Sequence, residues 1–111
     1  MEFASFEDFQ QLDIRVGTIV HAEPFLGANK PAYKLTIDFG SLGQKTSSAQ
    51  ITALYSLDDL KGRQVMAVIN FPVKRIAGFK SEVLVLGVVN EEKEVVLLKP
   101  ASEVPNGSVV R

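Results

Sequence analysis

The segment from Asn70 to Leu86 carries the side chains with the clearest capacity for chemistry. It contains hydrogen-bonding, cationic and aromatic residues in close succession: Asn70, Lys74, Arg75, Phe79, Lys80 and Ser81. Cations bind phosphates, an exposed aromatic ring stacks on unpaired bases, and amide and hydroxyl groups form hydrogen bonds with base edges. We expect Phe79 to be exposed, and we predict that this segment binds single-stranded or looped nucleic acid.

The net charge of −1 hides an uneven distribution of charged residues. Between Lys30 and Lys80, eight lysines and arginines stand against three aspartates, which gives this part of the chain a net charge of +5. The acidic residues concentrate toward the two ends. A basic patch acts through its local field and not through the total charge. Composition alone leaves two interpretations open: such a patch, or a mixed and solvated surface.

Residues that catalysis or metal binding requires are scarce. One histidine, His21, and no cysteine are too few soft ligands for a zinc site. The hydroxyl groups of residues 46–48 have no histidine that could serve as their base. Asp58 and Asp59 fall in the first turn of an expected helix, where acids stabilise the positive end of the helix dipole. We therefore expect no metal, no cofactor and no enzymatic activity.

Length and composition predict a single globular domain that comprises residues 1–111. The chain is 46% hydrophobic and 23% charged, which is typical of a globular protein. The lack of cysteine agrees with a reducing compartment, and the first residues lack the basic and apolar regions of a signal peptide. No apolar run approaches the ~20 residues that span a bilayer. We expect a cytoplasmic protein without membrane insertion.

Hydrophobic periodicity predicts a chain made mostly of short strands. Apolar residues alternate with polar ones most cleanly over 33–39, and the capping-box spacing occurs at Ser5 and at Ser56. Gly17 predicts a bulge or a sharp bend in mid-strand. The prolines and the glycine in 22–31 predict a connector without continuous strand. Helices are expected at 5–11 and 56–62, strands at 14–20, 33–39, 44–50, 65–69, 82–89 and 95–98, a loop at 70–81, and a tight turn at 105–107.

Five or six short strands with a helix after the third, and no alternation of strands and helices, favour a small closed barrel. The five-stranded OB-fold has a helix at that position and binds oligonucleotides on its strand 2–3 face and adjacent loops. We therefore predict an all-β OB-fold barrel of five strands, with a short N-terminal helix and a second helix between strands 3 and 4. Residues 1–12 form a helical N-terminal extension and residues 100–111 a C-terminal extension in this prediction.

Five motifs in order along the chain resemble the tRNA-binding domain family. They are Asp13–Gly17, Lys34–Gly40, Ser47–Ile51, Asn70–Lys74 and Gly78–Ser81. The resemblance covers residues 13–110 and implies an OB-fold module that contacts RNA. Together with the basic residues of the loop, it places the RNA-binding side chains at Lys34, Ser48, Asn70, Lys74, Arg75, Lys80 and Ser81. Glu82 departs from the family pattern, and we expect an acid at this position to repel phosphate.

The phrase from Asn70 to Gly87 and the ending Val104–Gly107 are most similar to the export-related chaperones of this family, which work as homodimers. The resemblance implies a homodimer that binds unfolded preproteins, with tRNA and the export machinery as further partners. The alternatives are a stand-alone tRNA-binding protein and an interaction subunit that docks on a synthetase. We expect client peptides to contact Phe71, Val73, Ile76 and Phe79, and the dimer interface to contain Phe3, Phe6, Phe9, Val109 and Val110.

Overall fold

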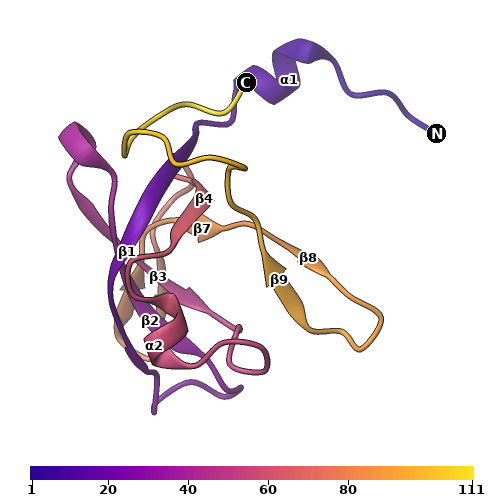
Figure 1. Cartoon of the computed structure of the whole chain (residues 1–111). Coiled ribbons are helices and arrows are strands. Elements are labelled where there is room, and N and C mark those ends of the chain that lie inside the picture. The colour runs from indigo at the N-terminus through magenta and orange to yellow at the C-terminus, as the bar shows by residue number, and fades with distance from the viewer.

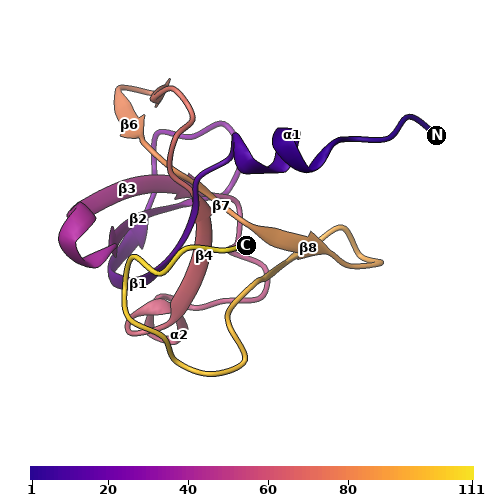
Figure 2. The ribbon, with the colours of Figure 1, turned by 90° about the horizontal axis from the view of Figure 1, so that it is seen from above.

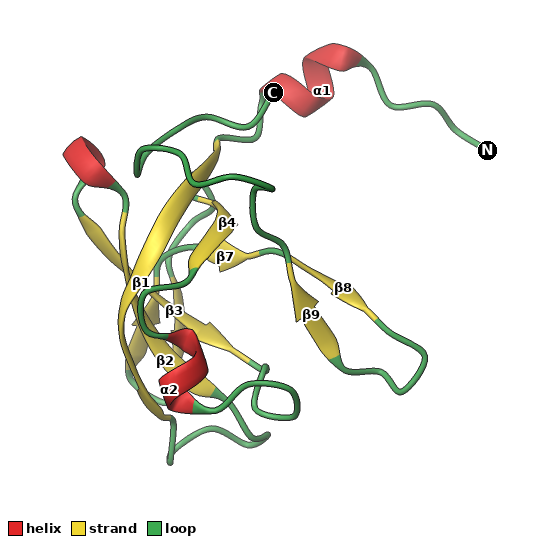
Figure 3. Cartoon of the chain, in the orientation of Figure 1, coloured by secondary structure: helices red, strands yellow, loops and turns green.

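All 111 residues are described in the computed structural model, and strands dominate its regular structure (Figures 1 and 3). The helical segments are α1 (Phe6–Gln10), the 3-10 turn η1 (Gly40–Leu42) and α2 (Leu57–Leu60). The strands are β1 (Ile14–Pro24), β2 (Tyr33–Asp38), β3 (Gln44–Ala49), β4 (Gln64–Val68), β5 (Lys74–Ile76), β6 (Phe79–Ser81), β7 (Leu84–Val85), β8 (Gly87–Val89) and β9 (Val95–Leu97).

Five strands form an antiparallel sheet in the order β3-β2-β1-β4-β7. The two ends of this sheet meet where the main-chain N–H groups of Glu82 and Val83 donate to the carbonyl oxygen of Thr46, at 2.8 and 3.2 Å. The buried hydroxyl of Ser47 adds a hydrogen bond of 2.9 Å to the Val83 carbonyl oxygen. The sheet is thereby a nearly closed barrel with α2 between β3 and β4, which confirms the predicted OB-fold.

Alternating residues of β2 fill the barrel, as the period-two pattern predicted. Leu35 and Ile37 are fully buried, together with Ile19 from β1 and Val65 from β4. Side chains on successive strand residues point to opposite faces of a sheet, so only every second residue of β2 enters the core. The side chains of the alternate residues of β2, including Lys34, therefore lie on the outer face of the barrel.

Gly17 is explained by close packing, and not by the bulge that we predicted there. A Cβ atom at this position would lie 2.6 Å from Ile37 Cγ2 and 2.8 Å from the Phe39 ring. The register of β1 against β2 shifts between Ile19 and His21, so the irregularity comes after Gly17. The absence of a side chain lets the core close over the middle of β1.

β1 extends further than the sequence predicted. Ala22, Glu23 and Pro24 pair with β2, although we assigned them to a connector. A proline is tolerated where a strand ends, because its missing N–H removes no interior hydrogen bond of the sheet. The irregular connector is thus confined to residues 25–32.

Residues 70–81 contain a hairpin, where we predicted a loop. β5 and β6 pair antiparallel, and the two residues between them, Ala77 and Gly78, have φ angles of 47° and 80°. Two consecutive residues with positive φ form the tight turn that suits a two-residue hairpin connection. The predicted strand 82–89 is also divided into β7 and β8, and β8 pairs with β9 in a second hairpin.

The C-terminal segment fills the edge of β1 that β2 leaves free. Ser108 accepts a hydrogen bond from the Val16 N–H at 2.9 Å, and the Val110 N–H donates to Ile14 at 2.8 Å. The predicted turn at 105–107 is present, because the Ser108 N–H donates to the Pro105 carbonyl oxygen at 3.1 Å. The C-terminus therefore lies next to α1 (Figure 1).

Neither α1 nor α2 has the length and apolar character that a helix needs to cross a membrane.

Candidate functional site

The β5–β6 hairpin packs against the connector through an aromatic pair. The rings of Phe25 and Phe79 meet edge to face with their centres 5.4 Å apart. Lys34 Nζ lies 5.0 Å from the centre of the first ring and 5.2 Å from the second, within the range of cation–π attraction. Phe79 is therefore half-buried, and the prediction that it is exposed was wrong. The sequence around Phe79 could not reveal this burial, because the ring that packs against it, Phe25, comes from the distant connector.

Four of the predicted RNA-binding residues form a row across the barrel wall and the hairpin. Lys34 pairs with Ser48 across β2 and β3, and Lys74 pairs with Ser81 across β5 and β6. The two pairs are joined because the Ser81 hydroxyl oxygen accepts a hydrogen bond from the Ser48 N–H at 3.0 Å. The fold thus brings together residues that are far apart in the sequence.

The hairpin presents three cations to solvent. Lys74 is exposed, and Arg75 and Lys80 pair with each other across the hairpin and are exposed as well. The chain's one ion pair between an arginine or lysine and an acid is Arg15–Asp13, so no acid lies within ion-pair distance of these three side chains. Like charges on neighbouring strands repel one another, and a bound polyanion would relieve that repulsion. Figure 2 shows β6 on the side of the barrel opposite α2.

Asn70 lies apart from this row and holds the N-terminal segment. Its side-chain oxygen accepts a hydrogen bond from the Asp13 N–H at 2.8 Å, and its amide nitrogen donates to the Gln11 carbonyl oxygen at 2.8 Å. Both ends of the amide are therefore engaged within the chain. The geometry gives Asn70 a structural role, and its contact with RNA stays a prediction.

Glu82 has a structural role that its sequence position did not reveal. One of its carboxylate oxygens accepts a hydrogen bond from the Thr46 N–H at 3.0 Å and lies 3.0 Å from the Thr46 hydroxyl oxygen. The acid we expected to repel phosphate is thus directed into the seam between β3 and the segment that follows β6. Hydrogen-bond donors around a carboxylate stabilise its charge.

The four apolar residues predicted for peptide binding do not form one surface. Phe71 and Val73 are exposed, and Phe71 lines an apolar pocket of about 180 Å³ together with Leu84. Ile76 lines a different groove, and Phe79 packs on Phe25. Lys74 lines both hollows, and the pocket beside Phe71 is lined by Glu82 as well.

A groove of about 330 Å³ lies between the connector, the end of β3 and β5. Besides Ser48 and Lys74, it is lined by three polar residues that the sequence analysis did not single out: Asn29, Lys30 and Gln50. The Asn29-Lys30 pair in a connector rich in proline and glycine was the signal that could have drawn attention to this part of the chain.

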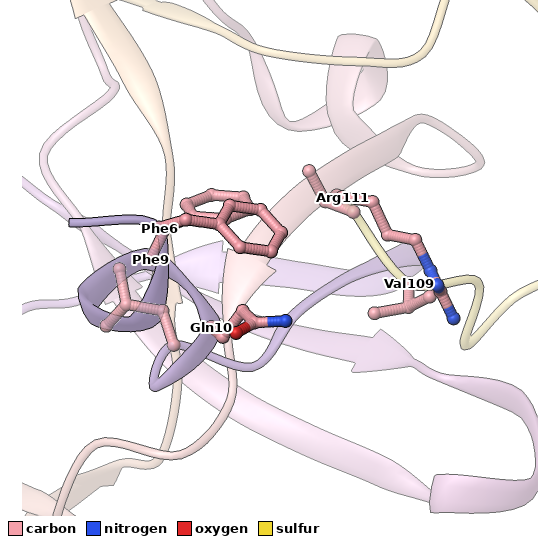
Figure 4. Close-up of a pocket in the computed structure, with 7 residues that line it drawn as sticks. Phe6, Phe9, Gln10, Val109 and Arg111 are labelled. Atoms are coloured by element: carbon pink, nitrogen blue, oxygen red, sulfur yellow. The ribbon is translucent and has the colours of Figure 1, made fainter.

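The residues predicted for the dimer interface gather where α1 meets the C-terminal segment, with one exception. Phe6 and Phe9 of α1 lie across a pocket of about 280 Å³ from Val109 (Figure 4). Val110 also lines this pocket, and Phe3 does not. The exposed fractions of Phe3 and Phe6 are 93% and 70%. Figures 1 and 2 show α1 and the β8–β9 hairpin projecting toward the same side.

The β8–β9 hairpin adds an apolar surface that the sequence analysis missed. Val88, Val89 and Val96 are all exposed on it. Valines in a strand are ordinarily read as core residues, and only the projection of this hairpin away from the barrel makes them accessible.

The structure contains no cluster of potential metal ligands. No group of three or more histidine, aspartate or glutamate side chains is placed to hold a metal ion. The pKa of Asp59 is lowered by hydrogen bonds from the main chain and the hydroxyl of Ser56, with a smaller contribution from Arg63. The main-chain bond, from the Ser56 N–H to the Asp59 carboxylate, belongs to the capping box that begins α2, as expected for an acid that stabilises a helix.

Comparison with known proteins agrees with this geometry. The family model described as "Putative tRNA binding domain" matches residues 14–109. The methionine–tRNA ligase of Chlorobium chlorochromatii is 36% identical over 107 residues. That alignment covers 96% of this chain and 15% of the ligase, so the chain spans only a small part of this relative.

Two solved chaperone structures match over nearly their whole length. The crystal structure of chaperone CsaA from Bacillus anthracis has a TM-score of 0.94 and 59% sequence identity, and the match covers 99% of this chain and 100% of that one. The CsaA structure from Picrophilus torridus has a TM-score of 0.92 and 47% identity, and the match covers 98% and 100%.

Proposed function

Because this chain belongs to the tRNA-binding domain family, we propose that it is a homodimeric, export-related chaperone that binds unfolded preproteins on a tRNA-binding type of OB-fold. The observation that carries this proposal is the similarity to two chaperones over the full length of the chain, at 59% and 47% identity. The cytoplasmic location and the contact with export machinery stay predictions from the sequence.

Client segments would bind around the apolar pocket beside Phe71. Its lining offers Phe71 and Leu84 for apolar side chains, and it carries both Lys74 and Glu82 for polar groups of a client. Exposed apolar surface beside polar residues is typical of a site that binds other chains. A pocket of about 180 Å³ accommodates single side chains and not a folded domain.

RNA binding is the second function that a specific observation favours. The row from Lys34 to Lys74, with Arg75 and Lys80 beside it, carries cations that have no acid within ion-pair distance. Such a surface attracts phosphates, and the hydroxyl groups of Ser48 and Ser81 lie within the row.

The two functions are separated by a paired titration. An unfolded preprotein and a tRNA are each titrated with the chain at two salt concentrations. If RNA is held by four phosphate contacts, a plot of the logarithm of its binding constant against the logarithm of the salt concentration has a slope of about −3 to −4. The affinity for a client held by apolar contacts changes little with salt. Phe71→Ser is expected to reduce the suppression of client aggregation and to leave tRNA affinity unchanged. Full aggregation suppression by a correctly folded Phe71→Ser variant would reject the pocket as the client site.

The homodimer would form through the face that carries α1, the C-terminal segment and the β8–β9 hairpin. Stable interfaces bury about 800 Å² on each partner, with an apolar centre. The pocket between α1 and the C-terminal segment, and the exposed valines of the hairpin, supply such a centre on one side of the molecule. Figure 2 shows α1 and β8 extending away from β6, and we expect such a pairing to leave the β5–β6 hairpin accessible.

A further inference from the structure

The turn at residues 105–107 contains a chemically labile pair that the proposed functions do not use. Asn106 is followed directly by Gly107, and asparagine is a thermolabile residue. Glycine has no side chain to shield its nitrogen, and its backbone freedom lets that nitrogen reach the preceding asparagine side chain. An Asn–Gly pair is therefore especially prone to deamidation when the chain around it is unfolded.

Deamidation uses the Gly107 nitrogen as its nucleophile. This nitrogen loses its proton and forms a bond to Cγ of Asn106, while the bond from Cγ to Nδ2 breaks and Nδ2 leaves as ammonia. Water then opens the resulting five-membered imide at one of its two carbonyl carbons. Opening at Cγ gives aspartate. Opening at the main-chain carbonyl carbon gives isoaspartate, in which the backbone runs through the side chain and is one atom longer.

The fold holds both reacting groups in hydrogen bonds. The Gly107 N–H donates to the Val16 carbonyl oxygen at 2.7 Å. Oδ1 of Asn106 accepts a hydrogen bond from the Thr18 hydroxyl at 2.7 Å, and a longer one of 3.3 Å from Nε2 of Gln64. Attack on Cγ therefore requires the nitrogen and the asparagine side chain to leave these partners.

The main chain at this pair also has little room to move. A Cβ atom on Gly107 would lie 2.6 Å from the Phe39 carbonyl oxygen, and one on Gly40 would lie 2.5 Å from the Asn106 carbonyl oxygen. The Gly107 carbonyl oxygen accepts a hydrogen bond of 2.9 Å from Nη1 of Arg15. Ring closure thus requires the C-terminal segment to separate from β1 and from residues 39–40.

We propose that Asn106 is a deamidation site that the native fold protects, and that it becomes reactive when the C-terminal segment separates from β1. Proteins open locally with free energies that range from near zero up to that of global unfolding. Only molecules in which this segment has opened react, so the native rate follows the opening equilibrium. The inference does not depend on which ligand the chain binds.

The two products have different consequences for the fold. An aspartate at position 106 keeps an oxygen that accepts hydrogen bonds from Thr18 and Gln64, so we expect the segment to pair with β1 again. Isoaspartate adds one backbone atom before Gly107. We expect this product to lose the register in which Gly107 and Val110 both donate hydrogen bonds to β1.

The test follows deamidation by peptide mass spectrometry in mildly alkaline buffer, with and without guanidinium chloride. Asn106 of the native chain is expected to react at least about tenfold more slowly than Asn106 of the unfolded chain. Asn29, which is exposed and precedes a lysine, is the internal control and is expected to react slowly in both conditions. Thr18→Val is expected to raise the native rate several-fold and to leave the unfolded rate unchanged. Thr52→Val removes a hydroxyl that makes no hydrogen bond within the chain, and this matched control is expected to react as the unmodified chain does.

Equal rates in the native and unfolded chain would overturn the protection, and an unfolded chain that does not react at Asn106 would overturn the site itself. Hydrogen exchange of the Gly107 N–H gives a second measurement that needs no variant. Its protection factor should match the factor by which folding slows deamidation, and free exchange beside slow deamidation would contradict the opening mechanism.

The products are compared after the unfolded chain has reacted and the isoaspartyl form has been separated and refolded. This form is expected to unfold at a lower urea concentration than the Asn106→Asp variant, which carries the other product. Equal midpoints of the two would overturn the argument from the register of the C-terminal segment.

Discussion

The Ser81 hydroxyl oxygen accepts a hydrogen bond of 3.0 Å from the main-chain N–H of Ser48. This bond joins the β5–β6 hairpin to the edge of β3, so the cations of the hairpin have a defined position relative to the barrel. A side chain predicted to contact RNA thus also builds the surface on which RNA would lie.

Ser81→Ala is expected to lower the free energy of unfolding by about 1–3 kcal/mol, because it leaves the half-buried Ser48 N–H without an acceptor. Urea unfolding followed by circular dichroism measures this change. Ser102→Ala is the control, since Ser102 is exposed and makes no hydrogen bond within the chain. Equal stability of the two variants would show that the Ser48–Ser81 bond contributes nothing.

Substitution of Lys34 is expected to lower the stability of the chain, whereas substitution of Lys80 is expected to weaken RNA binding. Lys34→Met retains the aliphatic stem but removes the charge over Phe25 and Phe79, at a cost of about 0.5–2 kcal/mol in unfolding free energy. Lys80→Met removes an exposed cation and is expected to weaken tRNA binding several-fold without a change in stability. Urea unfolding and tRNA titration of both variants check this. An unchanged stability of Lys34→Met together with a lowered stability of Lys80→Met would contradict it.

Gly17→Ala is expected to destabilise the barrel by about 1–3 kcal/mol, the usual cost of overpacking a core. The new methyl group would lie 2.6 Å from Ile37 and 2.8 Å from Phe39. Gly27→Ala is the matched control, because its methyl group would meet its nearest neighbour at 3.4 Å. Thermal unfolding of both variants measures the difference, and a Gly17→Ala variant as stable as the control would refute the packing argument.

Phe6→Ser combined with Phe9→Ser is expected to convert a dimer into a monomer, because both rings line the pocket at α1. Light scattering should then give a mass near 12.1 kDa, where the unmodified chain gives about twice that value. Leu26→Ser provides the control, since Leu26 is 94% exposed on the connector. A dimer that survives the double substitution, or an unmodified chain that is already monomeric, contradicts the assigned interface.

Local patterns predicted the elements whose signals lie within a few residues. The alternation in β2 and the capping boxes at Ser5 and Ser56 are examples, and both boxes are present in the structure. The β5–β6 hairpin was missed because each of its strands has only three residues, too few to show a period. Much of what holds it in place comes from Phe25 and Ser48, which are distant in sequence.

The candidate site shows the same limit. Lys74, Arg75 and Lys80 could be identified from their charge and spacing alone. The structural duties of Asn70 and Glu82 could not, because their partners are 57 and 36 residues away. Residues that bind main-chain groups across the fold look, in the sequence, like residues available for a ligand.

The pairing of the C-terminal segment with β1 has a consequence for how the chain folds. Arg15 donates a hydrogen bond to the Gly107 carbonyl oxygen across 92 residues. The edge of β1 from Ile14 to Val16 therefore stays open during synthesis until that late segment has emerged. Contacts between such distant residues slow folding, and an unpaired strand edge invites aggregation until it is filled. The protein that we propose to protect unfolded chains therefore has, during its own folding, a strand edge that is open to aggregation.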